Sequence, residues 1–122
     1  MFSYLCKKCK NNKIYNQLKF EELASNSNFE ELNNIKDYCS NIDLEKCLEI
    51  AVQSKNVSTA DFFIKQGAEN IDFCLKIASE NNMYEMVKLL IKNGGKTTIG
   101  LRYSKSPNII KMIYEFEENN KN

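Results

Sequence analysis

The chain has 122 residues, of which 43% are hydrophobic and 27% charged, and its formal net charge at pH 7 is +1. This balance is typical of one folded domain and excludes a disordered chain. No apolar run approaches the roughly 20 residues of a membrane-spanning helix. The first residues become basic only after a short apolar stretch, which is the reverse of a secretory signal. We therefore expect an intracellular, cytoplasmic protein that contacts no membrane and keeps its five cysteines reduced.

Histidine is absent from the sequence. Its absence excludes histidine-based triads, Cys-His nucleophiles and histidine metal sites. The single proline and four glycines leave room for uninterrupted helices. We predict that the protein is not an enzyme and has no cofactor or metal. An enzyme of a histidine-independent class stays an alternative, although no residue pattern marks a site for it.

Residues 1–15 are predicted to form an N-terminal capping helix. Four residues there follow the helical spacing i, i+3, i+4, i+7, namely Phe2, Leu5, Cys6 and Cys9. The Cys6–Cys9 spacing also fits zinc or dithiol chemistry. A zinc site without histidine needs four thiolates, usually as two close pairs, and the other cysteines are not paired in sequence. We therefore expect the cysteines to pack in the core as small apolar side chains.

The first 20 residues suggest an alternative function. They contain no acidic residue, and their five lysines are Lys7, Lys8, Lys10, Lys13 and Lys19. A basic stretch can bind nucleic acid or another acidic surface. We prefer to interpret it as a solvated helix end, with nucleic-acid binding as the less favoured alternative.

The acidic pairs Glu21-Glu22 and Glu30-Glu31 are likewise predicted to be solvated surface, since neighbours on a helix diverge by about 100°.

One internal period, of 27 residues, runs through the chain. Residues 47–68 align with residues 74–95 without a gap and are identical at seven of 22 positions. Periods of 20 to 50 residues indicate stacked supersecondary units. The period divides a single domain, 1–122, into an N-terminal cap helix at 1–15, repeats at 16–42, 43–69 and 70–96, and a degenerate C-terminal capping repeat at 97–122.

Each repeat is predicted to contain two helices. The first helix of the second repeat has an apolar stripe formed by Leu44, Cys47, Leu48 and Ala51. The same stripe returns 27 residues later at Ile71, Cys74, Leu75 and Ala78. Second-helix stripes are predicted at Met83, Met86, Val87 and Leu90, and at Ile109, Met112, Ile113 and Phe116, with Phe62 and Phe63 also in the core.

Start and stop signals keep the same period. Four residues with short side-chain oxygens are predicted helix caps, at Asn16, Asp43, Asn70 and Thr97. Gly67 and Gly94 are predicted to end the second helices in a left-handed turn. Asn28 and Asn82 are predicted for the turn inside the hairpins, where Lys55 takes the equivalent place without asparagine's tolerance of that conformation. Gly100 is expected to weaken a helix at 98–105, and Pro107 to start the last one.

Residues 78–94, ASENNMYEMVKLLIKNG, resemble the ankyrin repeat, whose pattern runs AAENGHLEVVKLLLEAG. The resemblance is specific for residues 71–95 and looser for 51–68. The usual ankyrin period is about 33 residues, and the missing residues are those of the β-hairpin finger and the T-P-L-H turn. Shortened repeats in a chain rich in Asn, Lys and Ile are similar to ankyrin-like proteins of large DNA viruses. The resemblance implies an all-α, short solenoid of stacked helix-turn-helix repeats with capping helices.

The resemblance also implies a function, which is to bind another protein through the concave face lined by the first helices. For a viral protein the partner would be a host factor. The outward first-helix positions, predicted to contact the partner, are Glu45, Lys46, Glu49, Gln53, Asp72, Phe73, Lys76 and Glu80. Phe73 is the large apolar residue of this set and replaces Lys46 of the previous repeat, so it is the foremost candidate contact.

Overall fold

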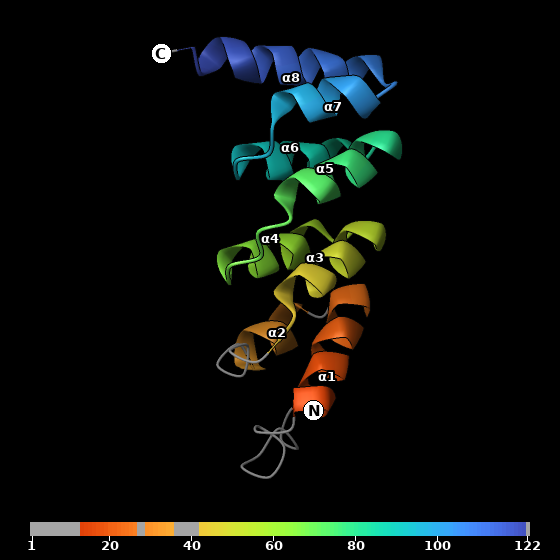
Figure 1. Cartoon of the computed structure of the whole chain (residues 1–122), viewed down its shortest axis with the longest axis vertical. Helices are drawn as coiled ribbons and strands as arrows, with labels where there is room; N and C mark the ends of the chain where they lie inside the picture. Colours follow the sequence, from red (N-terminus) through yellow and green to blue (C-terminus); the bar gives the residue numbers. More distant parts are fainter. Residues whose placement is uncertain (1–12, 27–28, 36–41, 122) are drawn as a thin grey trace. The chain divides into compact units, whose positions relative to one another are not determined.

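The computed structural model describes residues 13–26, 29–35 and 42–121 (Figure 1). In these residues every regular element is an α-helix, which confirms the all-α prediction for them. The helices are α1 (Lys13–Asn26), α2 (Phe29–Ile35), α3 (Leu44–Gln53), α4 (Val57–Lys65), α5 (Ile71–Glu80), α6 (Tyr84–Lys92), α7 (Thr97–Tyr103) and α8 (Pro107–Asn119). The predicted cap helix at 1–15 lies almost entirely outside the described residues, as do Cys6, Cys9 and Asn28.

The chain divides into two compact units at the boundary between two predicted repeats. Unit 1 is Met1–Glu69 and unit 2 is Asn70–Asn122. In unit 1, α3 packs along α4 on one side and α1 on the other, while α2 packs on α1 and α4. In unit 2, α5 packs along α6 and α7, and α8 covers α6 and α7. Each unit is therefore built from helical hairpins whose first helices lie next to one another.

The 27-residue period of the sequence is also a period of the structure. Helix α3 begins at Leu44 and α5 at Ile71, and the second helices begin at Val57 and Tyr84. Both pairs of starting residues are one period apart. The next hairpin departs from the period because α7 is short, with seven residues. Pro107 then starts α8 at its first turn, as predicted, where a missing N–H costs nothing.

Helices α3 to α6 all end in the same hydrogen-bonded turn. The second residue after each helix has a positive φ, and these residues are Lys55 (62°), Gly67 (116°), Asn82 (56°) and Gly94 (101°). The backbone N–H of the next residue donates a hydrogen bond to the carbonyl five residues earlier, as from Asn56 to Ala51 at 3.0 Å and from Gly95 to Leu90 at 2.9 Å. This is the Schellman pattern, in which glycine is favoured. The predicted glycine stops and the predicted turn residue Asn82 are confirmed.

The helix starts agree less well with the predicted caps. Asp43 is a true cap, because its Oδ1 accepts the N–H of Lys46 at 3.1 Å. Asn70 occupies the cap position of α5 without a side-chain bond to the helix end, so its predicted capping bond is wrong. Asn16 is also wrong as a cap, since it lies inside α1 and is buried. Thr97 is the first residue of α7, and Lys96 holds the cap position that Thr97 was predicted to hold.

The predicted apolar stripes form the cores of the two units. Cys47, Leu48 and Ala51 are buried in α3, and Cys74, Leu75 and Ala78 are buried in α5. The buried residues of the other helices include Phe20, Leu23, Ala24, Leu32, Phe62, Phe63, Met86, Val87, Leu90, Ile109, Met112 and Ile113. Leu44, Ile71, Met83 and Phe116 are half-buried at the ends of their stripes. Gly100 is buried where an added Cβ would lie 2.6 Å from Cδ1 of Ile113, so glycine permits the close packing of α7 on α8.

Candidate functional site

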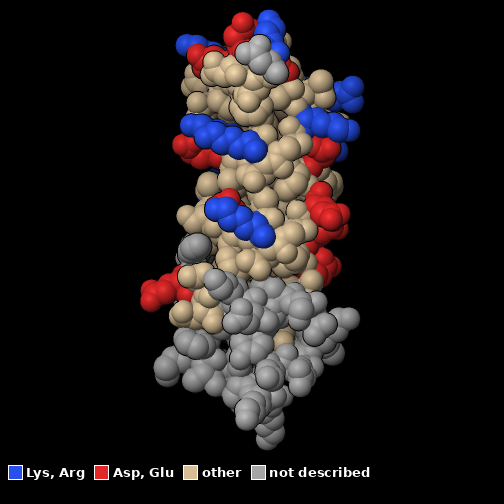
Figure 2. All heavy atoms as spheres, turned by 90° about the vertical axis from the view of Figure 1, so that its left-hand side faces the viewer, with Lys and Arg blue, Asp and Glu red and all other residues tan. Residues whose placement is uncertain are grey.

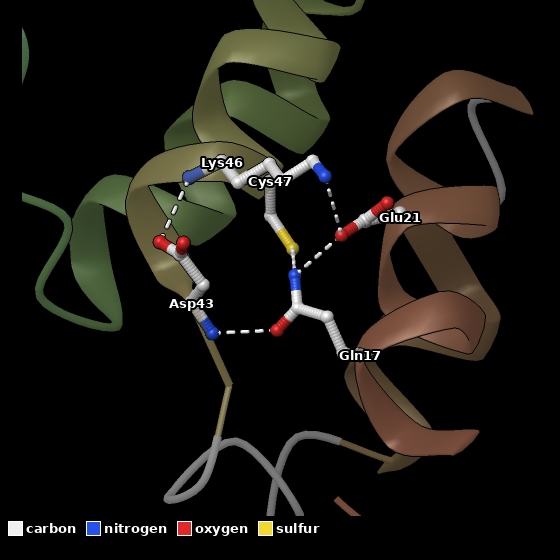
Figure 3. A network of polar contacts seen from close by, with 5 residues as sticks. All are labelled: Gln17, Glu21, Asp43, Lys46 and Cys47. Carbon is white, nitrogen blue, oxygen red and sulfur yellow. Dashed lines mark hydrogen bonds and ion pairs between the residues drawn. The ribbon is translucent and has the colours of Figure 1, made fainter. Parts of the chain in front are cut away.

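The predicted contact residues of unit 1 lie on the side of α3 that its buried stripe leaves open. Glu45, Lys46 and Gln53 are exposed, and Glu49 is half-buried. Helix α1 packs beside α3 and has an exposed leucine, Leu18. The Nζ of Lys46 lies 3.7 Å from Oε2 of Glu21 on α1 (Figure 3). The lysine of this pair is 61% exposed and the glutamate only 17% exposed, so the charge of Lys46 stays accessible to solvent while Glu21 is largely covered.

A glutamine amide joins α1 to the start of α3 beneath that ion pair (Figure 3). The Nε2 of Gln17 donates to Glu21 Oε2 at 2.7 Å and approaches the Sγ of Cys47 at 3.7 Å. Its Oε1 accepts the backbone N–H of Asp43 at 2.6 Å. Asp43 in turn caps α3. The two ends of one amide therefore fix where α3 begins relative to α1.

Unit 2 has an equivalent contact two hairpins later, between α5 and the start of α7. The Oδ1 of Asp72 on α5 accepts the backbone N–H of Lys96 at 2.9 Å. Lys96 is the cap residue of α7, as Asp43 is of α3. In both units, a polar side chain on the first helix of one hairpin accepts a hydrogen bond from the backbone N–H just before the first helix of the next hairpin. Asp72, predicted as a partner contact, is thus engaged in holding α7, and this also explains why α7 begins after Lys96.

The remaining predicted residues of unit 2 form a surface around an exposed aromatic ring. Phe73 is 52% exposed, which confirms that it lies outward. Three residues further along α5, Lys76 extends its Nζ over the ring of Tyr103, 5.1 Å from the centroid. A cation over a ring face is attracted by about 0.5–1 kcal/mol at exposed sites, which favours this orientation of Lys76. Glu80 is exposed at the end of the same helix. We call Phe73, Lys76, Glu80 and Tyr103 the Phe73 surface.

The acidic pairs differ from the prediction of solvated surface. Glu31 is only 14% exposed in its side chain and lies 3.3 Å from Lys19, which is 10% exposed. Glu21 is likewise largely covered, whereas Glu22 and Glu30 are exposed. Since neighbouring residues diverge on a helix, one member of each pair turns toward the adjacent helix and there meets a lysine. The prediction is therefore wrong for Glu21 and Glu31.

The burial of Lys19 also bears on the nucleic-acid alternative. Its ammonium lies between Glu31 and Glu22, 4.0 Å from the latter, and is not offered to a phosphate. The alternative now depends on Lys7, Lys8, Lys10 and Lys13, whose side chains lie outside the described part of the chain. On the face drawn in Figure 2, Lys and Arg stand beside Asp and Glu among the described residues, and neither sign forms a large patch there.

The sequence prediction missed a second aromatic surface in unit 2. Tyr114 on α8 is 57% exposed, and Tyr84 at the start of α6 is exposed too. A shallow, open hollow on α8 is lined by Pro107, Ile110, Lys111, Tyr114, Glu115 and Glu118, which we call the α8 face. A second hollow of about 570 Å³ shares Lys111 and Glu115 and extends to Tyr84. The signal was present in the sequence as outward positions spaced three and four apart on α8.

Among residues 13–26, 29–35 and 42–121, no three metal-binding side chains gather into a group that could hold a metal ion. The described helices include none with the length and apolarity to cross a membrane. Cys47 and Cys74 are buried at equivalent positions and take part in no disulfide. The described chain is thus an all-α arrangement of repeated helical hairpins. Comparisons with models of protein families, with curated proteins and with solved structures give no significant match to this sequence.

Proposed function

We propose that this chain is a non-catalytic protein-interaction module, a short solenoid of finger-less ankyrin-like repeats. It binds a partner protein through the outward faces of its first helices, α3 and α5. The hairpins α3–α4 and α5–α6 support the proposal of a repeat protein, because their helices start one period apart and end in the same type of turn. Stacked repeats of this kind use an extended helical face for binding. The buried thiols of Cys47 and Cys74, which take part in no disulfide, suit the reducing cytoplasm.

The observation that carries the proposal is the exposure of Phe73. A half-exposed phenylalanine on a polar helix face leaves apolar area in water, which a partner's pocket would remove. Full burial of such a side chain stabilises by about 1.5–3 kcal/mol, so the exposed half is worth roughly 1 kcal/mol in a complex. Aromatic residues in this setting are typical binding anchors. Lys76, attracted to the ring of Tyr103, presents a positive charge beside the anchor, and this attraction lowers the entropy cost of ordering the lysine on binding.

The test compares three proteins as baits in the native cell extract: the wild type, Phe73→Ala and Tyr114→Ala. All are used at low concentration, and melting curves verify that each is folded. We expect the wild type and Tyr114→Ala to capture the same partner and Phe73→Ala to lose most of it. The matched control removes an equally exposed aromatic from a different surface of unit 2. Equal capture by all three baits would overturn the proposal.

A titration with the identified partner then separates two roles within the Phe73 surface. Phe73→Ala should weaken binding by at least about 1 kcal/mol, mostly through faster dissociation. Lys76→Glu should chiefly slow association and change its dependence on salt. If Lys76→Glu instead changes neither rate, the partner does not approach this part of α5.

A further inference from the structure

Two charged residues flank the exposed ring of Phe73 on α5, and one of the two is already compensated within the protein. Asp72 accepts the backbone N–H of Lys96 through its Oδ1 at 2.9 Å. It also lies in the first turn of α5, where the free N–H groups of the helix stabilise a negative charge. The carboxylate of Asp72 is therefore satisfied before any partner binds.

Lys76 is the second of these residues, and no acidic group of the described chain neutralises it. Residues three apart are neighbours on a helix surface, so Lys76 shares a face with Phe73. Its Nζ lies 5.1 Å from the centroid of the Tyr103 ring. It forms no ion pair with a carboxylate of residues 13–26, 29–35 and 42–121. Glu80, on the same face, is about 10 Å from Phe73 along the helix axis. The charge beside the ring that is available to a partner is therefore positive.

The helix next to α5 in unit 2 adds further positive charge. Helix α7 packs along α5, and residues 86–114, which include all of α7, contain no acidic residue. Three exposed cations lie in α7 or next to its ends, namely Lys96, Arg102 and Lys105. Because a helix of seven residues is about 10 Å long, or about one Debye length, these charges act on a group bound beside it. From α8, Glu117 reaches the start of α7, where its carboxylate accepts the hydroxyl of Thr97.

We propose that the partner presents to the Phe73 surface a segment in which an acidic residue lies close to a large apolar residue. This inference rests on the proposed function and names the chemistry of the partner. The apolar side chain packs on the ring of Phe73, and the carboxylate pairs with Lys76 in the positive potential of α7. A basic residue at the same place would face Lys76 and the cations of α7, so the surface selects against it.

The test is selection of binders from a displayed library of short random peptides, with the folded whole chain as the immobilised target. Wild type should enrich peptides with Asp or Glu close to a large apolar residue. These peptides should bind both Phe73→Ala and Lys76→Gln at least about fivefold more weakly. A separate selection on Lys76→Glu should enrich a basic residue in place of the acidic one. Lys88→Glu, which reverses an exposed lysine on α6, is the matched control and should select the same acidic peptides as the wild type.

The outcomes separate this inference from the proposed function. Selected peptides that depend on Phe73 but lack an acidic residue would overturn the inference and leave the proposed function standing. Acidic peptides that are still selected by Lys76→Glu would overturn it too, and so would a wild-type selection without an enriched sequence. Peptides that bind Phe73→Ala as tightly as the wild type would instead contradict the proposed function, because their site lies elsewhere, and the inference would fail with it.

Discussion

The hydroxyl of Ser79 is buried in α5 without a hydrogen-bond partner and is 0% exposed. A hydroxyl that loses water without gaining a partner costs about 1–3 kcal/mol. Ser79→Ala removes this cost, keeps the Cβ and leaves a gap of only one oxygen atom. The equivalent residue of the previous hairpin is Val52, which is also fully buried, so this position accepts an apolar side chain. We expect Ser79→Ala to raise the free energy of unfolding by about 1 kcal/mol.

The assay is urea denaturation followed by circular dichroism, where a change in midpoint at constant slope reports a change in stability. Ser104 provides the matched control in the same unit. It is 7% exposed, and its Oγ accepts the N–H of Ser106 at 3.2 Å. Ser104→Ala should therefore lower stability by about 0.5–1.5 kcal/mol, the opposite sign for the same chemical change. The reasoning is refuted if Ser79→Ala also destabilises by more than about 0.5 kcal/mol, because its hydroxyl must then be bonded.

Three further substitutions test the hairpins by the same denaturation assay. Leu75→Ala should lower stability by about 2–5 kcal/mol, because Leu75 is fully buried, and a change below about 0.5 kcal/mol would place it outside the core. Asp43→Ala should lower the free energy of unfolding by about 0.5–2 kcal/mol, because it removes the side-chain oxygen that caps α3. Asp43→Asn should leave stability almost unchanged, since an amide oxygen also accepts the capping hydrogen bond. An equal loss of stability in both variants would exclude capping. Gly94→Ala should lower the free energy of unfolding by about 1 kcal/mol, because alanine is strained at the positive φ of this residue. No atom lies within 4 Å of the added Cβ, so a steric clash does not contribute. A variant that is more stable than the wild type would contradict the left-handed turn.

The features that followed from the sequence are those decided by local rules. The spacing of Leu48 and Leu75 within their stripes predicts burial, because it fixes one face of a helix. Gly67 and Gly94 predict helix ends, because a left-handed turn excludes most other residues. Phe73 was identified by comparing equivalent positions in two repeats, one holding lysine and the other phenylalanine. Its exposure in the structure agrees with that comparison.

The features that escaped prediction depend on neighbouring helices. Asn16 has the chemistry of a cap, but the packing of α1 places it inside the helix. The start of α7 is set by Asp72, a residue 24 positions before Lys96, and no local signal near Thr97 reports it. Glu31 resembles any surface glutamate until α2 folds against α1 and brings it to Lys19. The α8 face was missed because its mixed charges are typical of an ordinary solvated helix.

Hydrogen–deuterium exchange of the whole chain, alone and saturated with its captured partner, tests the central claim most directly. Amide exchange reports which segments become ordered or covered when the partner binds. We predict slower exchange in α3 and α5, greatest in the peptides that contain Glu45–Gln53 and Asp72–Glu80, with α4, α6 and α8 nearly unchanged. Protection confined to α4, α6 or α8, or to the lysine-rich first 20 residues, would contradict binding through the first helices.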